Sequence, residues 1–278
     1  MAGRECHRGH GMSTPPDGRD GVRSVHRALY LLTLFDEEHP ARTMRELVDL
    51  AELPKTTVLR LVKTLEQSGY LYDRPDGRIC LGPKLIRISR AVDLVWKLPV
   101  AVDATMERLR ERSRETVNLY VREGQYRVCA AQKQGPQAIR YVIPVGMQLP
   151  LWGGAAAKVL LAHAATDLID RVLKEGGKNA AYREWLLHEL KRVREAGFAA
   201  SHGERERGSS SVAAAIRAGE RTVAALAISG PTLRFTDTRV HEFAELLRNA
   251  THDMERSFTK DMDREGLGTA WVGTSAAR

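Results

Sequence analysis

Apolar residues recur at helical spacing in two short segments, 44–51 and 55–67, which are separated by Leu53-Pro54. Proline prevents a helix from running through it and suits the first turn of a new one. Spacing of i, i+3, i+4, i+7 gives each helix one apolar face to bury. These faces consist of Met44, Leu47, Val48 and Ala51, and of Val58, Leu61, Val62 and Leu65. The pattern predicts two helices joined by a tight turn.

Local signals mark the ends of these helices. Thr43 and Glu46 have capping-box spacing, in which a hydroxyl accepts from the third amide and a carboxylate reaches back. Gly69 follows the second helix at the position where glycine tolerates a positive φ. Residues 70–81 then read as a β-hairpin with Pro-Asp-Gly at its turn. This order is typical of a winged helix-turn-helix, whose second helix enters the major groove of DNA.

The polar face of the second helix carries no carboxylate. It consists of Thr56, Arg60, Lys63 and Gln67, with Lys55, Thr57 and Thr64 at its margins. Residues 53–90 hold eight Lys and Arg against three acids, an excess that favours phosphate backbones through counterion release. Alone, this face could be an ordinary solvated surface. Together with the hairpin it predicts binding to double-stranded DNA.

The position of each residue along the second helix determines its expected role in DNA binding. N-terminal residues of a recognition helix touch base edges, so Thr56, Thr57 and Arg60 are the candidate readers. Lys55 and Lys63 are expected to bind phosphates, which orient the domain without reading sequence. Alternatively, the hairpin only closes the small core and makes no contact with DNA. The predicted DNA contacts are Thr43, Lys55, Thr56, Thr57, Arg60 and Lys63, together with Arg74 and Arg78 in the wing.

Changes in pattern divide the rest of the chain. Residues 22–35 predict a first helix with a core face of Val22, Val25, Leu29 and Leu32, and residues 84–96 predict a linker helix. The predicted divisions are a disordered tail at 1–20, a winged helix-turn-helix domain at 21–83, a linker helix at 84–98, an α+β domain at 99–264 and a flexible tail at 265–278.

The segment after residue 98 alternates between helical and strand-like patterns. Helices are predicted at 102–113, 155–163, 167–174, 182–196 and 237–262, and strands at 116–122, 126–132, 139–143, 212–216 and 222–229. The last helix has a face formed by Phe243, Leu247, Ala250, Met254 and Phe258. The fold class is therefore a multi-domain α+β protein with an N-terminal winged helix-turn-helix.

Composition narrows the class of protein. The 278 residues are 43% hydrophobic and carry a net charge of +8, as in a soluble protein with an anionic partner. No apolar run approaches the ~18 residues of a membrane span, and no secretory signal is present, so we expect a cytoplasmic protein without a membrane partner.

Cys6, Cys80 and Cys129 form no disulfide framework and no CxxC pattern. No metal and no cofactor are expected. Met12 is a second candidate start of translation.

Four motifs together resemble the IclR family of bacterial transcriptional regulators. They are the helix-turn-helix segment MRELVDLAELPKTTVLRLVKTLEQSGYLYDRPDGRICLG, then LPLWGGAAAKVLLA, VREAGFAASHGERERGSSSVAAAI and VAALAISGP. The resemblance covers roughly residues 22–262 and implies a C-terminal GAF-like domain that binds a small effector. It also implies dimers or dimers of dimers whose affinity for an operator changes with the effector.

The resemblance places the effector pocket at the loop that enters the helix predicted at 155–163, at Ser209–Ser211, and on the last strand. The implied effector-binding residues are Gly153, Gly154, Ala155, Ser209, Ser210, Ser211, Ala227 and Ser229. Unpaired amides at a helix N-terminus attract a carboxylate, so an organic acid is expected. Trp152, Ser201 and Ser211 depart from the histidine, acidic residue and cysteine common in the family, which favours a reshaped pocket without a metal.

The predicted function is therefore a ligand-responsive repressor or activator that binds a pseudo-palindromic operator as a homodimer or homotetramer. Two alternatives remain. A serine hydrolase could use a nucleophile among Ser209–Ser211 with His202 as base, but no GxSxG elbow and no placed acid support it, so no catalytic residue is assigned. The C-terminal domain could also bind a protein instead of a small molecule.

Overall fold

The structure, a computed structural model, describes residues 21–36, 39–95, 98–219 and 221–265, with the side chains of 92–95 and 257–265 left aside. It divides into two units, Met1–Lys97 and Leu98–Arg278, each with its own core. The features expected at Cys6, Met12, Trp96 and the two terminal tails lie outside the described residues, as does the side chain of Phe258.

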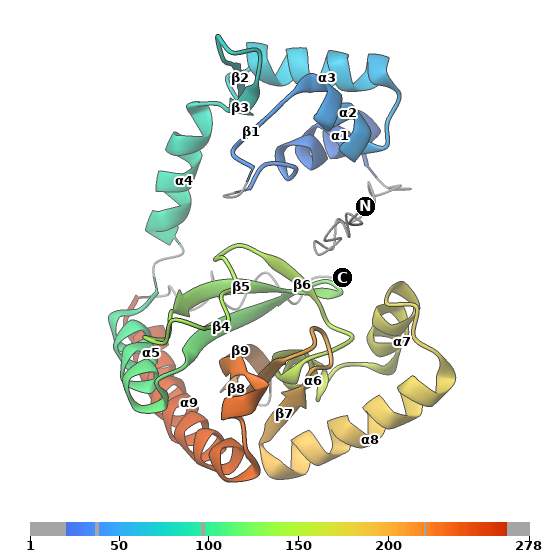
Figure 1. Cartoon of the computed structure of the whole chain (residues 1–278). Coiled ribbons are helices and arrows are strands. Elements are labelled where there is room, and N and C mark those ends of the chain that lie inside the picture. The colour runs from blue at the N-terminus through green and yellow to red at the C-terminus, as the bar shows by residue number, and fades with distance from the viewer. Residues whose placement is uncertain (1–20, 37–38, 96–97, 220, 266–278) are drawn as a thin grey trace. The chain divides into compact units, whose positions relative to one another are not determined.

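The first unit is a winged helix-turn-helix (Figure 1). Its elements are α1 (Arg23–Leu32), β1 (Ala41–Arg42), α2 (Met44–Ala51), α3 (Lys55–Gln67), β2 (Leu71–Asp73), β3 (Ile79–Leu81) and α4 (Lys84–Val95). The three strands form an antiparallel sheet in the order β1-β3-β2, so β1 adds a strand that the sequence pattern did not predict.

Local capping determines where these helices begin and end. The Thr43 hydroxyl accepts from the Glu46 amide, and the Glu46 carboxylate accepts from the Thr43 amide at 2.6 Å, which confirms the capping box. Pro54 lies at the N-cap of α3. At the other end Gly69 has φ +77°, and Tyr70 N–H donates to the Leu65 carbonyl, as in a Schellman motif. The predicted helix-turn-helix is confirmed.

The core of this unit includes the predicted faces of α2 and α3 but a different face of α1. Tyr30 and Leu31 are buried, whereas Val22, Val25 and Leu29 are 64%, 51% and 56% exposed. The predicted core face of the first helix is therefore wrong at Val22, Val25 and Leu29, whereas Leu32 packs against the core as predicted. Apolar residues surround most of this helix, so its period fits two faces, and packing against α2 and α3 selects the one with Leu31.

The second unit contains a six-stranded antiparallel sheet in the order β6-β5-β4-β9-β8-β7. Its elements are α5 (Val100–Ser113), β4 (Thr116–Glu123), β5 (Tyr126–Lys133), β6 (Gln148–Pro150), α6 (Ala155–Leu161), α7 (Thr166–Glu175), α8 (Ala180–Ala196), β7 (Phe198–His202), β8 (Ser209–Ala218), β9 (Arg221–Pro231), the 3-10 turn η1 (Thr232–Arg234) and α9 (Asp237–Glu265). The predicted α+β class is confirmed, although β6, β7 and η1 were not predicted.

Helices cover both faces of this sheet (Figure 1). One face packs on α5 and α9, where Phe243 and Leu247 are fully buried, and the other packs on α6, α7 and α8. Successive residues of a strand point to opposite faces, so Val212 belongs to the first core and Ala213 to the second. This alternation decides which serine hydroxyls can reach the α6 side.

The strand predicted at 139–143 is absent, and the described backbone there is irregular. The position beside β5 is taken instead by β6, which pairs through Leu149 with Arg127. The carbonyl of Ile143 accepts a hydrogen bond from the Gln132 side chain at 2.8 Å, not from a neighbouring strand. The prediction was wrong because an alternating apolar run specifies a strand only if a sheet edge is free to pair with it. Within the described residues, no helix is both long and apolar enough to cross a membrane.

Candidate functional site

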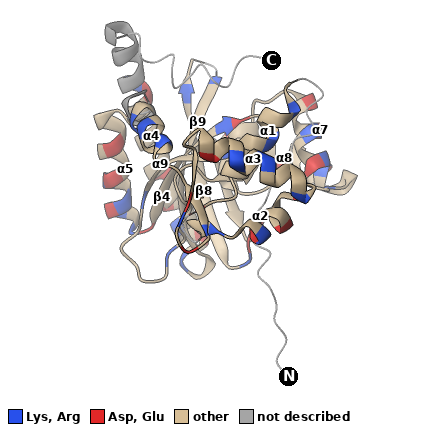
Figure 2. Ribbon diagram, turned by 90° about the horizontal axis from the view of Figure 1, so that it is seen from above, with Lys and Arg blue, Asp and Glu red and all other residues tan. Residues whose placement is uncertain are grey.

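The polar face of α3 is open to solvent. The apolar stripe led by Val58 and Val62 faces the core, and the opposite stripe is exposed. Lysine and arginine residues, marked in blue on the ribbon, occur along both α3 and α4 (Figure 2). The exposed residues of the face are Lys55, Thr56, Arg60, Lys63, Thr64 and Gln67, and Thr57 is half-buried. The structure therefore gathers the predicted base and phosphate contacts of α3 on one accessible surface.

The remaining predicted DNA contacts make bonds within the protein. The Thr43 hydroxyl is engaged in the capping box with Glu46. Hydrogen bonds from Thr43 hold the pKa of Glu46 below its usual value. Arg78 Nη2 lies 3.7 Å from this carboxylate, and Arg74 pairs with Asp76 across the wing turn at 3.2 Å. Both arginines are about half exposed and flank the turn.

Close backbone contacts join the end of α3 to the start of α4. Gly82 N–H donates to the Tyr70 carbonyl at 2.7 Å, and Lys84 N–H donates to the Gly69 carbonyl. A Cβ at Gly82 would lie 2.4 Å from the Gly69 oxygen, so only glycine fits. The Lys84 ammonium also lies 4.8 Å from the centre of the Tyr70 ring.

The second unit contains a cavity of about 40 Å³ on the α6 side of its sheet. Seven of the eight residues predicted for the effector pocket line it, and Gly153 does not. These seven are Gly154, Ala155, Ser209, Ser210, Ser211, Ala227 and Ser229. The other lining residues are Tyr120, Arg127, Tyr141, Leu149, Ala156, Ser201 and Arg205. Residues distant in sequence thus surround one space, which has room for roughly three water molecules.

The serines differ in where their hydroxyls point. Ser211 and Ser229 share a face with Ala213 and Ala227, on the α6 side, and are paired across β8 and β9. The Ser210 hydroxyl is bonded to Thr232 at 2.9 Å and lies 3.0 Å from His202 Nδ1. Ser210 therefore borders the cavity with its backbone rather than its hydroxyl.

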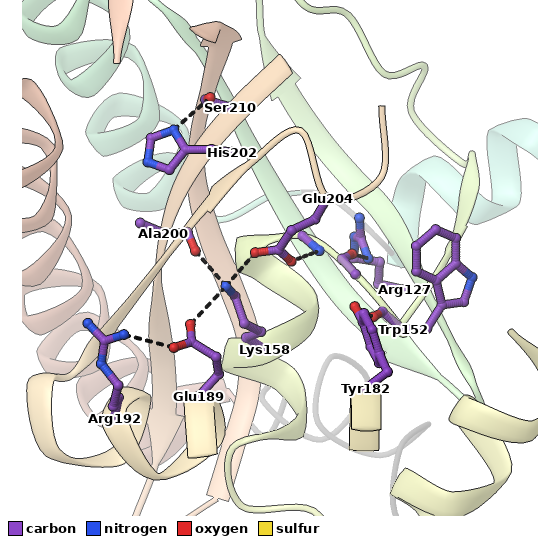
Figure 3. A network of polar contacts seen from close by, with 12 residues as sticks. Arg127, Trp152, Lys158, Tyr182, Glu189, Arg192, Ala200, His202, Glu204 and Ser210 are labelled. Carbon is purple, nitrogen blue, oxygen red and sulfur yellow. Dashed lines mark hydrogen bonds and ion pairs between the residues drawn. The ribbon is translucent and has the colours of Figure 1, made fainter. Parts of the chain in front are cut away.

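The N-terminus of α6 is capped from within the protein. Gly154 N–H donates to Glu204 Oε2 at 2.9 Å, so the expectation of an unpaired amide at this position is wrong. Glu204 Oε1 also pairs with the Lys158 ammonium at 2.6 Å (Figure 3). Lys158, only 2% exposed, further donates to the Ala200 carbonyl and to Glu189. One carboxylate thus joins the cavity rim to a buried lysine.

Arg127 and Arg205 are charged residues of this site that the sequence pattern did not predict, and Arg127 is the more deeply buried of the two. It lines the cavity from β5 and is 4% exposed. Its Nη1 donates to the carbonyls of Pro150 and Gly153, while its guanidinium lies 5.5 Å from the centre of the Tyr120 ring. Burial lowers the pKa of Arg127 to about 10 and raises the pKa of Tyr120. The only signal in the sequence was one arginine among apolar neighbours in a predicted strand.

Comparison with known proteins identifies the family of both units. Residues 24–75 match the family described as the IclR helix-turn-helix domain. Residues 96–256 match the family described as bacterial transcriptional regulator IclR C-terminal. The chain belongs to the IclR family.

Individual relatives support the assignment along most of the chain. An IclR-family transcriptional regulator of known structure from Rhodococcus sp. is 40% identical, with 88% of this chain and 97% of that chain covered and a TM-score of 0.56. KipR, an HTH-type transcriptional regulator of Bacillus subtilis, is 29% identical over 84% of this chain and 96% of its own length. An IclR homologue from Microbacterium hydrocarbonoxydans, solved with 4-hydroxybenzoate, is 24% identical, covers 85% of this chain and 99% of its own, and has a TM-score of 0.70.

Membership in the IclR family confirms the predicted regulator of transcription and excludes the alternative of an enzyme, because the family consists of DNA-binding regulators. The contact between His202 and Ser210 resembles a hydrolase pair at 3.0 Å. Yet Ser210 is 3% exposed, and no carboxylate contacts His202 within the described parts of the chain. The pair is better explained as packing between β7 and β8, whose register places these residues opposite each other.

Trp152, for which the sequence predicts a narrowed or reshaped pocket, is not part of the cavity wall of this IclR-family regulator. Its ring is absent from the cavity wall, packs over Gly176, and lies 3.8 Å from the Lys178 ammonium. A Cβ at Gly176 would be 2.6 Å from the indole. The Trp152 carbonyl accepts from the Tyr182 hydroxyl, which fixes the loop before α6 (Figure 3). The tryptophan therefore acts on the pocket through the position of this loop.

Proposed function

We propose that this IclR-family regulator binds a pseudo-palindromic operator as a homodimer or dimer of dimers and represses or activates transcription according to a small organic acid in its C-terminal cavity. The observation that carries the proposal is the cavity lined by Gly154, Ser211 and Ser229, in the same chain as an exposed basic α3. Ligand sites are concave and carry a few convergent polar groups, as this space does.

For DNA, the proposal assigns base contacts to the N-terminal half of α3. Thr56, Thr57 and Arg60 lie within its first two turns, and Arg60 has the fork of donors that suits guanine. Lys55 and Lys63 bind phosphates, and Arg74 and Arg78 bind the backbone beside the wing. Thr43 contributes through the cap of α2, because its hydroxyl is already engaged by Glu46.

For the effector, the proposal rests on the cavity and on its polar lining. Seven residues of the predicted set surround the space. Gly153 is not part of the cavity wall, but its carbonyl accepts a hydrogen bond from the lining residue Arg127. The relative from Microbacterium hydrocarbonoxydans is described with 4-hydroxybenzoate, which is an organic acid. A ligand of this class changes DNA affinity only if it binds the two functional arrangements of the protein unequally.

The test is binding of the full chain to the DNA upstream of its own gene, measured by footprinting and by titration at several salt concentrations. Arg60→Ala should weaken binding to the protected site by about 1–3 kcal/mol and relax one base preference. Lys63→Ala should weaken binding to all sequences alike and reduce the salt dependence. Equal effects of both substitutions on every sequence would refute the assignment of Arg60 as a base reader. Absence of any salt-sensitive protected site would refute the function itself.

A further inference from the structure

We propose that Arg127 binds the anionic group of the effector, so that the cavity selects carboxylates and similar oxyanions over neutral compounds of the same shape. The inference deepens the proposed function, because it rests on the cavity being the effector site. It assigns recognition of the ligand's charge to Arg127, which was not among the eight effector-binding residues implied by the family resemblance.

The bonds of the Arg127 guanidinium leave one of its edges available. Nη1 donates to two backbone carbonyls, those of Pro150 and Gly153. Nε is enclosed without an acceptor, and no hydrogen bond is recorded from Nη2 to any described residue. The N–H groups of Nε and Nη2 point in parallel, which is the arrangement that a carboxylate binds with both oxygens. The free edge is therefore the one suited to an acid.

The backbone beside Nη2 of this edge carries no side chain. Gly154 has φ +99°, and a Cβ there would lie 3.1 Å from Arg127 Nη2. A side chain at this position would thus press on the guanidinium and would also be strained by the backbone conformation. Glycine at residue 154 keeps the side of Arg127 nearest to α6 free.

The charges near Arg127 are matched to other partners. Glu204 pairs with Lys158 at 2.6 Å, and Glu206 pairs with Arg205 at 3.3 Å. No carboxylate forms an ion pair with Arg127 among residues 21–36, 39–95, 98–219 and 221–265. Although burial lowers its pKa to about 10, the guanidinium is a cation at neutral pH. A buried charge without a counter-ion is unfavourable, and an anionic ligand would relieve that cost.

Hydroxyl groups face the same space from the sheet. Ser211 and Ser229 lie on the α6 side of β8 and β9, and Ser201 is opposite Ser211 on β7. Hydroxyls can donate to a second oxygen of a ligand once its carboxylate is bound. The combination of Arg127, the second lining arginine Arg205 and several hydroxyls fits a small hydroxy- or oxo-acid better than a hydrocarbon or an amine.

A purely structural role for Arg127 makes the opposite prediction. In that case Nη1 would only hold the loop between β6 and α6, through the carbonyls of Pro150 and Gly153. Removal of the arginine would then affect the binding of acids and neutral compounds equally. Selectivity between matched ligands, rather than stability, is the quantity that separates the two roles.

The experiment compares acetate with acetamide, a neutral molecule of nearly the same shape that is small enough for a 40 Å³ cavity. Binding to the full chain is measured by calorimetry and by the shift in thermal midpoint, at constant ionic strength set with sodium chloride. We expect acetate to bind at least about ten-fold more tightly than acetamide, because hydrogen bonds to charged groups are the stronger ones.

Three variants complete the test. Arg127→Met should abolish the preference for the acid, and Arg127→Lys, which keeps the charge but not the fork, should weaken acetate binding about ten-fold while a preference remains. Arg194→Met is the matched control, because Arg194 also donates to a backbone carbonyl, that of Ala162, outside the cavity. If Arg127→Met does not fold, as judged by circular dichroism, Arg127→Lys decides the outcome.

The outcomes distinguish this inference from the proposed function. Equal affinities for acid and amide, no response to acetate, or an unchanged preference in both Arg127 variants would overturn the role of Arg127. Loss of binding of both ligands after Ala227→Leu, which fills the cavity, would still support the effector site in that case. Binding that survives Ala227→Leu would instead place the ligand elsewhere and overturn the proposed site.

Discussion

Replacing Lys158 by methionine should strongly destabilise the second unit. The Lys158 ammonium lies 2.6 Å from Glu204, 3.2 Å from Glu189 and 2.6 Å from the Ala200 carbonyl, and the side chain is 2% exposed. Methionine has a similar length but leaves Glu204 without a cation and Glu189 with only Arg192, which is 68% exposed, while the two carboxylates are 16–17% exposed. Removing one partner of a buried ion pair costs about 3–5 kcal/mol, so we expect a loss of unfolding free energy in that range.

The assay is urea unfolding of the full chain, followed by far-ultraviolet circular dichroism and by tryptophan fluorescence. Trp185 reports on this region, because its ring centre is 5.4 Å from the Lys158 ammonium. Lys133→Met is the matched control. Its ammonium lies 2.7 Å from Asp103, but the two side chains are 26% and 51% exposed, so its removal should cost at most about 1 kcal/mol.

A similar cost for the two lysines would refute the reasoning, because distance rather than burial would then determine the energy. A more stable Lys158→Met protein would refute it as well. The triple variant Lys158→Met, Glu189→Gln, Glu204→Gln should recover part of the loss, since the repulsion between the two acids is removed.

Two further predictions concern the two units separately. Thr43→Ala should lower the unfolding free energy of the helix-turn-helix by about 1 kcal/mol through loss of the α2 cap, while Thr43→Ser should retain it; equal midpoints for all three proteins in urea would contradict the role of the cap. Ala227→Leu, which adds three carbon atoms to the cavity wall, should abolish the response of DNA binding to the effector in electrophoretic titrations of a variant that circular dichroism shows to be folded; a retained response would exclude the cavity.

Features set by neighbouring residues were predictable from the sequence. The capping box of Thr43 and Glu46, the break at Pro54 and the end of α3 at Gly69 depend on contacts within a few residues. The wing turn also follows from local chemistry, since Gly77 has φ +75°. These elements were correct because no distant contact competes with them.

Features set by distant residues were not predictable in the same way. The segment 139–143 forms no strand because β6 pairs with β5 at that edge of the sheet. In α1, the helices that pack against it determine that Leu31 is buried. At the cavity, Arg127 donates a hydrogen bond to a carbonyl 26 positions away, and Glu204 accepts one from an amide 50 positions away. Glycine and serine positions could be inferred from the family resemblance, but the charged groups that complete the site required the folded chain.

The junction of α3 and α4 has a mechanical consequence. Hydrogen bonds at Gly69 and Tyr70, together with the tight approach of Gly82, leave no slack between the end of one helix and the start of the next. We therefore expect a rotation of α4 to reorient α3 and the wing together with it. Any signal that tilts α4 by a few degrees will change the angle at which α3 meets a DNA groove, without unfolding either helix.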